Sequence, residues 1–177
     1  FPGSFLARFA THNYALEELL YGNYGKGVKG MEESLSHSNS TGAQLARQIM
    51  LAGIYAQGGE IAKAEEYLET ASGNMGNLMT WPHMGAKNME VLFDNARAFI
   101  MAAQGNTAEA EALLRKTIES WRPFKDKDMS ASGLDPKTAG RIHIYFLRHL
   151  GQLLLDQGRY VEAETIGREA VLFTIPL

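Results

Sequence analysis

Cysteine is absent from this 177-residue sequence. Its absence excludes disulfide scaffolds, thiolate zinc sites, iron–sulfur clusters and cysteine nucleophiles. It leaves the compartment open, because a chain without cysteine is suited to the cytoplasm and to the periplasm alike. The first four residues, Phe1-Pro2-Gly3-Ser4, contain neither an initiator Met nor a signal peptide. We therefore interpret the chain as a processed protein or as part of a longer one.

Long apolar runs and a net charge of one sign are missing as well. The longest apolar stretch, residues 91–103, is interrupted by Asp94, Asn95 and Arg97, whereas a membrane-spanning helix needs about 20 apolar residues. The 17 basic and 20 acidic side chains leave a net charge of −3, which produces no field that would attract nucleic acid or an anionic membrane. We expect a soluble chain, cytoplasmic or periplasmic, with neither nucleic acid nor membrane as its partner.

Signatures of catalysis and of metal binding are also lacking. Two of the five histidines, His143 and His149, are six residues apart and are expected on different faces of one helix, while His37 and His83 are expected in loops. No His-Glu-x-x-His motif, calcium-loop spacing or Gly-x-Ser-x-Gly elbow occurs, and residues 22–30 (GNYGKGVKG) lack the Lys-Ser/Thr ending of a phosphate loop. We expect solvated or core-edge histidines, no catalytic residue, no metal and no cofactor.

Acidic residues near the expected helix starts have basic neighbours. Glu109 and Glu111 are one example, and Glu162 and Glu164 are another. Negative charge at a helix start interacts favourably with the helix dipole, so we interpret these residues as solvated faces rather than catalytic carboxylate pairs.

What the sequence does contain is a helical pattern that occurs four times. Each copy has a small residue in a first apolar stretch, then a turn glycine, then a small residue in a second stretch. The small residues of the first stretch are Ala15, Ala52, Ala98 and Gly151. The turn glycines are Gly22, Gly59, Gly105 and Gly158, and the small residues of the second stretch are Gly27, Ala64, Ala110 and Ala163. The glycine can adopt the left-handed conformation that ends a helix, and the small residues let the two helices approach closely.

Large apolar residues follow four positions after the second small residue and are expected in the core. They are Met31, Leu68 and Leu114, whereas the last copy has Gly167 at this position. The packing of the last copy is therefore expected to differ from that of the others.

This pattern resembles the tetratricopeptide repeat, most clearly in the second and fourth copies. The resemblance implies an all-α fold, a right-handed α-α superhelix (solenoid) of about four helix-turn-helix repeats. The second small residues fall at 27, 64, 110 and 163, giving spacings of 37, 46 and 53 (64−27, 110−64, 163−110) instead of the usual ~34. The later repeats must therefore have longer helices or longer connections.

The expected helices cover 4–21, 24–36, 42–57, 60–73, 85–104, 107–121, 137–157 and 160–173. Residues 36–42, 74–85 and 122–136 have the composition of linkers, and Asp135-Pro136 is a typical helix start. We predict a single domain, 1–177, with repeats at roughly 5–35, 42–73, 86–121 and 137–173.

The resemblance further implies that the first helices of each pair line a concave groove for a partner. The matching positions are His12, Leu16, Leu19, Ile49, Gly53, Asn95, Phe99, Tyr145, Arg148 and Gln152. The Asn95 amide could bond to an extended peptide backbone, and Arg148 could pair with a carboxylate. The alternative is that these side chains only cover the inner face. The Lys-and-Asn clamp of some family members is not reproduced, so a chaperone tail is not expected.

Three functions remain open from the sequence. The first is an interaction scaffold that binds a protein, a peptide or another domain of its parent chain. The second is a regulatory or ligand-sensing part of a larger enzyme or regulator, since the repeats resemble bacterial arrays that precede caspase-like protease domains. The third is a module that forms a homodimer through its terminal stretch, residues 171–177. A peptide binder requires a polar and aromatic groove, a ligand sensor a closed pocket, and a dimer a symmetric contact.

Overall fold

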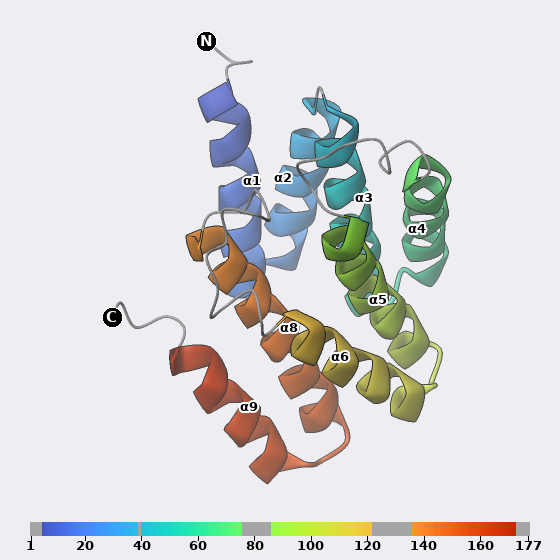
Figure 1. Ribbon diagram of the computed structural model, residues 1–177, viewed down its shortest axis with the longest axis vertical. Coiled ribbons are helices and arrows are strands. Elements are labelled where there is room, and N and C mark those ends of the chain that lie inside the picture. The colour runs from blue at the N-terminus through green and yellow to red at the C-terminus, as the bar shows by residue number, and fades with distance from the viewer. Residues whose placement is uncertain (1–4, 39, 76–85, 122–135, 173–177) are drawn as a thin grey trace. The chain divides into compact units, whose positions relative to one another are not determined.

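A computed structural model describes residues 5–38, 40–75, 86–121 and 136–172, and this part contains eight α-helices and no strand (Figure 1). The helices are α1 (Phe5–Leu20), α2 (Tyr24–Ser36), α3 (Thr41–Gln57), α4 (Ile61–Met75), α5 (Ala86–Ala103), α6 (Thr107–Trp121), α8 (Pro136–Asp156) and α9 (Tyr160–Leu172). Every bound lies within two residues of the expected one, and Pro136 begins α8 as predicted. The prediction of an all-α helical repeat is confirmed.

The helices pack in consecutive pairs, α1 with α2, α3 with α4, α5 with α6 and α8 with α9. The chain divides into two compact units, Phe1–Pro82 and His83–Leu177, which hold two pairs each. Within the first unit α2 also contacts α3, and within the second α6 also contacts α8. The predicted linkers 74–85 and 122–136 fall almost wholly outside the described residues. The single-domain boundaries and repeat limits stay a prediction.

The same turn joins the two helices of every pair. Its glycine has a positive φ in all four cases: 81° at Gly22, 78° at Gly59, 89° at Gly105 and 73° at Gly158. In the last pair the Gly158 N–H donates to the Leu155 carbonyl and the Arg159 N–H to the Leu154 carbonyl, both at 2.9 Å, and the other three turns repeat this pattern. This is the Schellman arrangement, which satisfies the carbonyls at the end of a helix and needs a left-handed residue.

The start of each second helix is fixed by the turn as well. The Ala163 N–H donates to the Arg159 carbonyl at 3.0 Å, and Gly27, Ala64 and Ala110 make the equivalent bond. The small residue is therefore always five positions after the turn glycine, where it is buried against the first helix. The fourfold pattern in the sequence is thus a repeated geometry of backbone hydrogen bonds.

Glycine replaces alanine in α2 because the first pair packs more closely. A Cβ atom on Gly27 would lie 2.4 Å from Cγ of Leu19, and one on Gly30 would lie 3.0 Å from Cβ of Ala15. Two carbon atoms do not approach to 2.4 Å, so the backbone of α2 occupies space that a side chain fills elsewhere.

The connection between α2 and α3 is ordered by hydrogen bonds. The Ser40 hydroxyl caps α3 by accepting from the Ala43 N–H at 3.3 Å, and the Arg47 guanidinium donates to the Ser34 hydroxyl at 2.6 Å. Ser38 is buried and donates to the Ser34 carbonyl at 2.8 Å. These bonds hold α3 against the first pair.

The core of the second unit lies around α8, which contacts both α6 and α9. Trp121 of α6 packs edge to face on Phe146 of α8, with ring centroids 5.7 Å apart. Leu114, Leu150 and Leu154 belong to the same buried cluster. Burial of such side chains contributes about 1.5–3 kcal/mol each, so these contacts position α8 on the α5–α6 pair.

Candidate functional site

The predicted groove residues of the first unit lie on α1 and α3. His12 and Leu16 are partly buried, and Ile49 is buried. The Nδ1 atom of His12 is buried and has no hydrogen-bond partner in the described part. Burial, together with the positive charge of Arg47, lowers the pKa of His12 to about 4, so the imidazole is neutral at pH 7.

Four side chains of the second unit, two of them polar, form a buried cluster between α5 and α8. Asn95 contacts the ring of His149, with its amide nitrogen 3.3 Å and its amide oxygen 3.4 Å from Nδ1. The rings of Phe99 and Tyr145 pack edge to face against the same imidazole. Asn95 is only 3% exposed and His149 only 1%. The structure therefore places the Asn95 amide inside the unit, where it is already engaged.

Burial sets the protonation of this cluster. It keeps the pKa of His149 well below the ordinary value, with the nearby Arg148 acting in the same direction. Burial also raises the pKa of Tyr145, so its hydroxyl is neutral. We conclude that Asn95, Phe99, Tyr145 and His149 connect α5 to α8 as a neutral group.

The expectation that the histidines are solvated or at the core edge is wrong for His143 and His149. Both are buried in α8 although they are six residues apart. The reason is that α8 is covered by α6 and by α9, so more than one of its faces is interior. His143 faces the carboxylate of Glu169 on α9, with Nε2 3.8 Å from Oε1.

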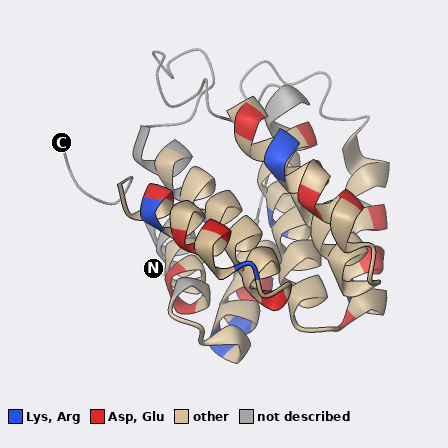
Figure 2. Cartoon of the chain, turned by 90° about the horizontal axis from the view of Figure 1, so that it is seen from below, with Lys and Arg blue, Asp and Glu red and all other residues tan. Residues whose placement is uncertain are grey.

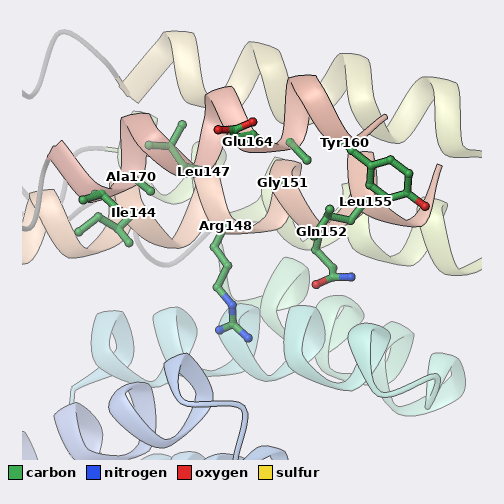
Figure 3. Close-up of a pocket in the computed structure, with 12 residues that line it drawn as sticks. Ile144, Leu147, Arg148, Gly151, Gln152, Leu155, Tyr160, Glu164 and Ala170 are labelled. Carbon is green, nitrogen blue, oxygen red and sulfur yellow. The ribbon is translucent and has the colours of Figure 1, made fainter. Parts of the chain in front are cut away.

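A groove runs along the pair formed by α8 and α9 (Figure 3). It has a volume of about 530 Å³ and its lining is mostly apolar. Residues of α8 that line it include Ile144, Leu147, Arg148, Gly151, Gln152 and Leu155. Those of α9 include Tyr160, Ala163, Glu164, Gly167, Ala170 and Val171. Two of the predicted partner-binding residues, Arg148 and Gln152, therefore belong to one continuous surface feature.

Arg148 and Gln152 form one edge of the groove. Their side chains leave α8 on the same side, away from Glu164 (Figure 3). Gln152 donates to the Asp156 carboxylate at 2.8 Å, whereas Arg148 makes no hydrogen bond or ion pair in the described part of the chain. A guanidinium beside an apolar groove is suited to pairing with a carboxylate of a binding partner.

At one level the groove is lined by a glycine where the preceding helix pair has a leucine. Leu114 of α6 is buried in the core, and the equivalent position in α9 is Gly167. A Cβ atom added to Gly167 would meet nothing within 4 Å. The sequence predicted that the last helix pair packs differently at this position. In the structure, the space beside the Gly167 Cα is open where Leu114 fills the core of the preceding pair.

Charged residues are interspersed along the described helices (Figure 2). Glu111 is a correction to the expectation of solvated acidic faces, because its side chain is only 15% exposed. The guanidinium of Arg159 bonds to this carboxylate and Arg115 bonds to it at 2.8 Å, and together they lower the pKa of Glu111. Arg159 also bonds to Glu162 at 2.6 Å, so the network connects α6 with α9.

The described helices lack two further features. They contain no group of three or more His, Asp or Glu that could hold a metal ion, although His83 lies outside the residues covered. None of these helices is long and apolar enough to cross a membrane.

The repeated pairs, with one turn geometry and one set of small contact residues, define an α-helical repeat protein. Two family models described as tetratricopeptide repeat match the chain, one at residues 92–116 and one at residues 145–174. The first match runs from α5 into α6 and the second from α8 into α9. The chain is therefore a tetratricopeptide repeat protein. No curated protein matches its sequence.

Tetratricopeptide repeats generally mediate protein–protein interactions and are typically scaffolds rather than enzymes.

Proposed function

We propose that this chain is an interaction scaffold whose protein partner contacts α8 along the side that carries Arg148 and Gln152. The observation that carries the proposal is Arg148, a permanently charged side chain at the edge of an apolar groove, with no partner among the described residues. Partner-binding surfaces commonly combine an apolar centre with a polar edge and are enriched in arginine.

The other predicted partner-binding residues have a supporting part in this proposal. In the second unit Asn95, Phe99 and Tyr145 are buried around His149, so they hold α8 in place rather than offer free polar atoms. In the first unit Ile49 is buried, and His12 and Leu16 are only partly exposed. We propose that the partner contacts each unit chiefly through the few exposed side-chain atoms on the first helix of each pair.

A ligand-sensing role is the second candidate, because about 530 Å³ lies within the range of small-molecule pockets. Such pockets enclose most of their ligand, however, and this groove is open along the surface of one helix pair (Figure 3). An elongated protein segment suits this shape better than a compact metabolite.

The test is quantitative affinity capture from lysate of the source organism with the Arg148→Ala, Gln152→Ala double variant. We expect capture of a protein that the unchanged chain retains to be reduced about tenfold or more, since arginine is among the residues whose truncation most often costs an interface about 2 kcal/mol or more. Asn95 is unsuitable for this purpose, because its removal breaks the buried contact with His149.

The control is Arg97→Ala, Gln104→Ala, which removes the same two residue types from exposed positions of α5 and the turn after it. Circular dichroism must show equal helicity for both variants. Equal capture by the two variants would show that this side of α8 is not the binding surface.

A further inference from the structure

Large exposed apolar side chains gather on the last helix pair. Among the described residues they include Leu155, Tyr160, Val161, Val171 and Leu172, which are 46% to 79% exposed, and otherwise Tyr14 and Tyr21. Leu155, Tyr160 and Val171 line the groove itself. Exposed apolar side chains that gather along a groove are typical of a docking site.

Within the second unit, the α5–α6 pair has residues at the repeat positions that correspond to this groove edge. Those residues pack against another helix. The repeat shifts residues by 53 positions from the α5–α6 pair to the α8–α9 pair, as from Ala98 to Gly151 and from Ala110 to Ala163. By this shift Asn95 corresponds to Arg148, and Phe99 corresponds to Gln152. In the earlier pair these two residues hold His149 of the next helix, α8. The surface of the α5–α6 pair therefore packs against the next helix, α8. The groove edge is the corresponding surface of the α8–α9 pair.

The residue differences between the two surfaces specify the helix that would fit. Where Asn95 faces the neutral ring of His149, Arg148 presents a positive charge, so its counterpart should be a carboxylate. Where Leu114 fills the core, Gly167 leaves space, so the helix should carry a large apolar side chain at that level. The apolar lining requires an apolar stripe along the rest of the helix.

We propose that the groove between α8 and α9 receives an amphipathic α-helix of a partner protein, with a large apolar side chain over Gly167 and a carboxylate on Arg148. The proposal rests on the proposed function and adds to it the conformation and chemistry of the partner segment. Docking of an amphipathic helix into an apolar groove is an established mode of peptide recognition.

The probes are two displayed peptide libraries, selected in parallel against the full chain. The first contains 18-residue amphipathic helices with a fixed apolar stripe and random flanking positions. The second has the same composition with prolines placed to keep the peptides extended. We expect helices to be enriched, with Asp or Glu at one fixed position relative to the stripe.

Selected helices are then measured against variants of the chain. Gly167→Leu fills the open space and is expected to weaken binding about tenfold or more, the equivalent of 1.4 kcal/mol. Arg148→Glu is expected to weaken it further, and exchange of the peptide carboxylate for Lys is expected to restore part of the loss. Gly73→Leu is the control, because Gly73 lies on an exposed part of α4 with nothing near its Cβ position.

The outcomes separate this inference from the proposed function. Enrichment of extended peptides alone, with binding lost in Arg148→Ala, would overturn the helix and retain the scaffold. If the selected helices bind the Gly167→Leu variant with unchanged affinity, the groove is not their binding site. Failure of both libraries would contradict both proposals. Sedimentation could also show that the chain self-associates and that Gly167→Leu abolishes this self-association. The occupant of the groove would then be a second copy of the chain, which would contradict the proposal of a partner protein's helix.

Discussion

Single residues set how closely the helices of a pair approach, and α2 shows this most directly. Gly27 faces Leu19 where even one methyl group would overlap, whereas Gly25, two residues earlier, has nothing within 4 Å of its Cβ position. The two glycines are in the same helix and have opposite surroundings. They form a matched pair for separating packing from helix propensity.

Gly27→Ala is expected to lower the free energy of unfolding by about 1–3 kcal/mol, because overpacking forces the helices of the first pair apart. Gly25→Ala is expected to raise it by about 0.5–1 kcal/mol, since alanine is the better helix former at an open site. Urea unfolding followed by circular dichroism measures both. A stabilising Gly27→Ala would contradict the close approach of α2 to α1.

At this scale the sequence predicted residues with local roles and missed those with distant partners. The turn glycines and small contact residues were found because their spacing repeats. The engagement of Asn95 by His149 was not, because the two residues are 54 positions apart and no short pattern connects them. The same holds for Arg159 and Glu111, which are 48 positions apart.

Whole helices differ in how much of their surface is covered. In the second unit α8 contacts α6 and α9 and buries both of its central histidines, whereas α9 buries Ala163 as its one fully covered residue in the described part. In the first unit α3 buries most of residues 49–56, whereas α4 buries only Ala64 and Ala71. The helix bounds themselves were predictable, since turns and periodicity are local signals.

Hydrogen exchange is expected to separate these helices. Amides of α3 and α8 should exchange most slowly, and those of α4 and α9 should exchange faster by about an order of magnitude or more, because fewer buried contacts oppose their opening. Native-state exchange followed by mass spectrometry measures this difference. Equal protection of α8 and α9 would show that α9 is held by more than its contacts with α8 and the Arg159 network.

For the whole molecule, each unit contains a neutral histidine whose pKa is lowered by burial: the partly buried His12 in the first and the fully buried His149 in the second. A histidine with a lowered pKa in the folded state binds its proton more readily when unfolded. Its contribution to stability is therefore complete above the unfolded pKa of about 6.5 and is lost as the pH falls below it.

The free energy of unfolding is expected to decrease by up to about 1.4 kcal/mol per pH unit for each of these histidines below pH 6.5. For His12 the decrease continues down to a pKa of about 4. Urea unfolding at several pH values between 7.5 and 5 measures the slope. His12→Gln is expected to reduce the slope, since it removes one of the two groups whose pKa is lowered. A flat profile in this range would contradict the burial of both side chains.

The four identical turns also determine the order in which the chain acquires its structure. Each turn joins two helices that pack on each other, so most contacts of the array connect residues close in sequence. Chains with such low contact order fold within about microseconds to milliseconds, and repeat arrays can nucleate at any point. A helix pair of this protein can therefore close as soon as its two helices and their glycine have left the ribosome, before the rest of the chain has been synthesised.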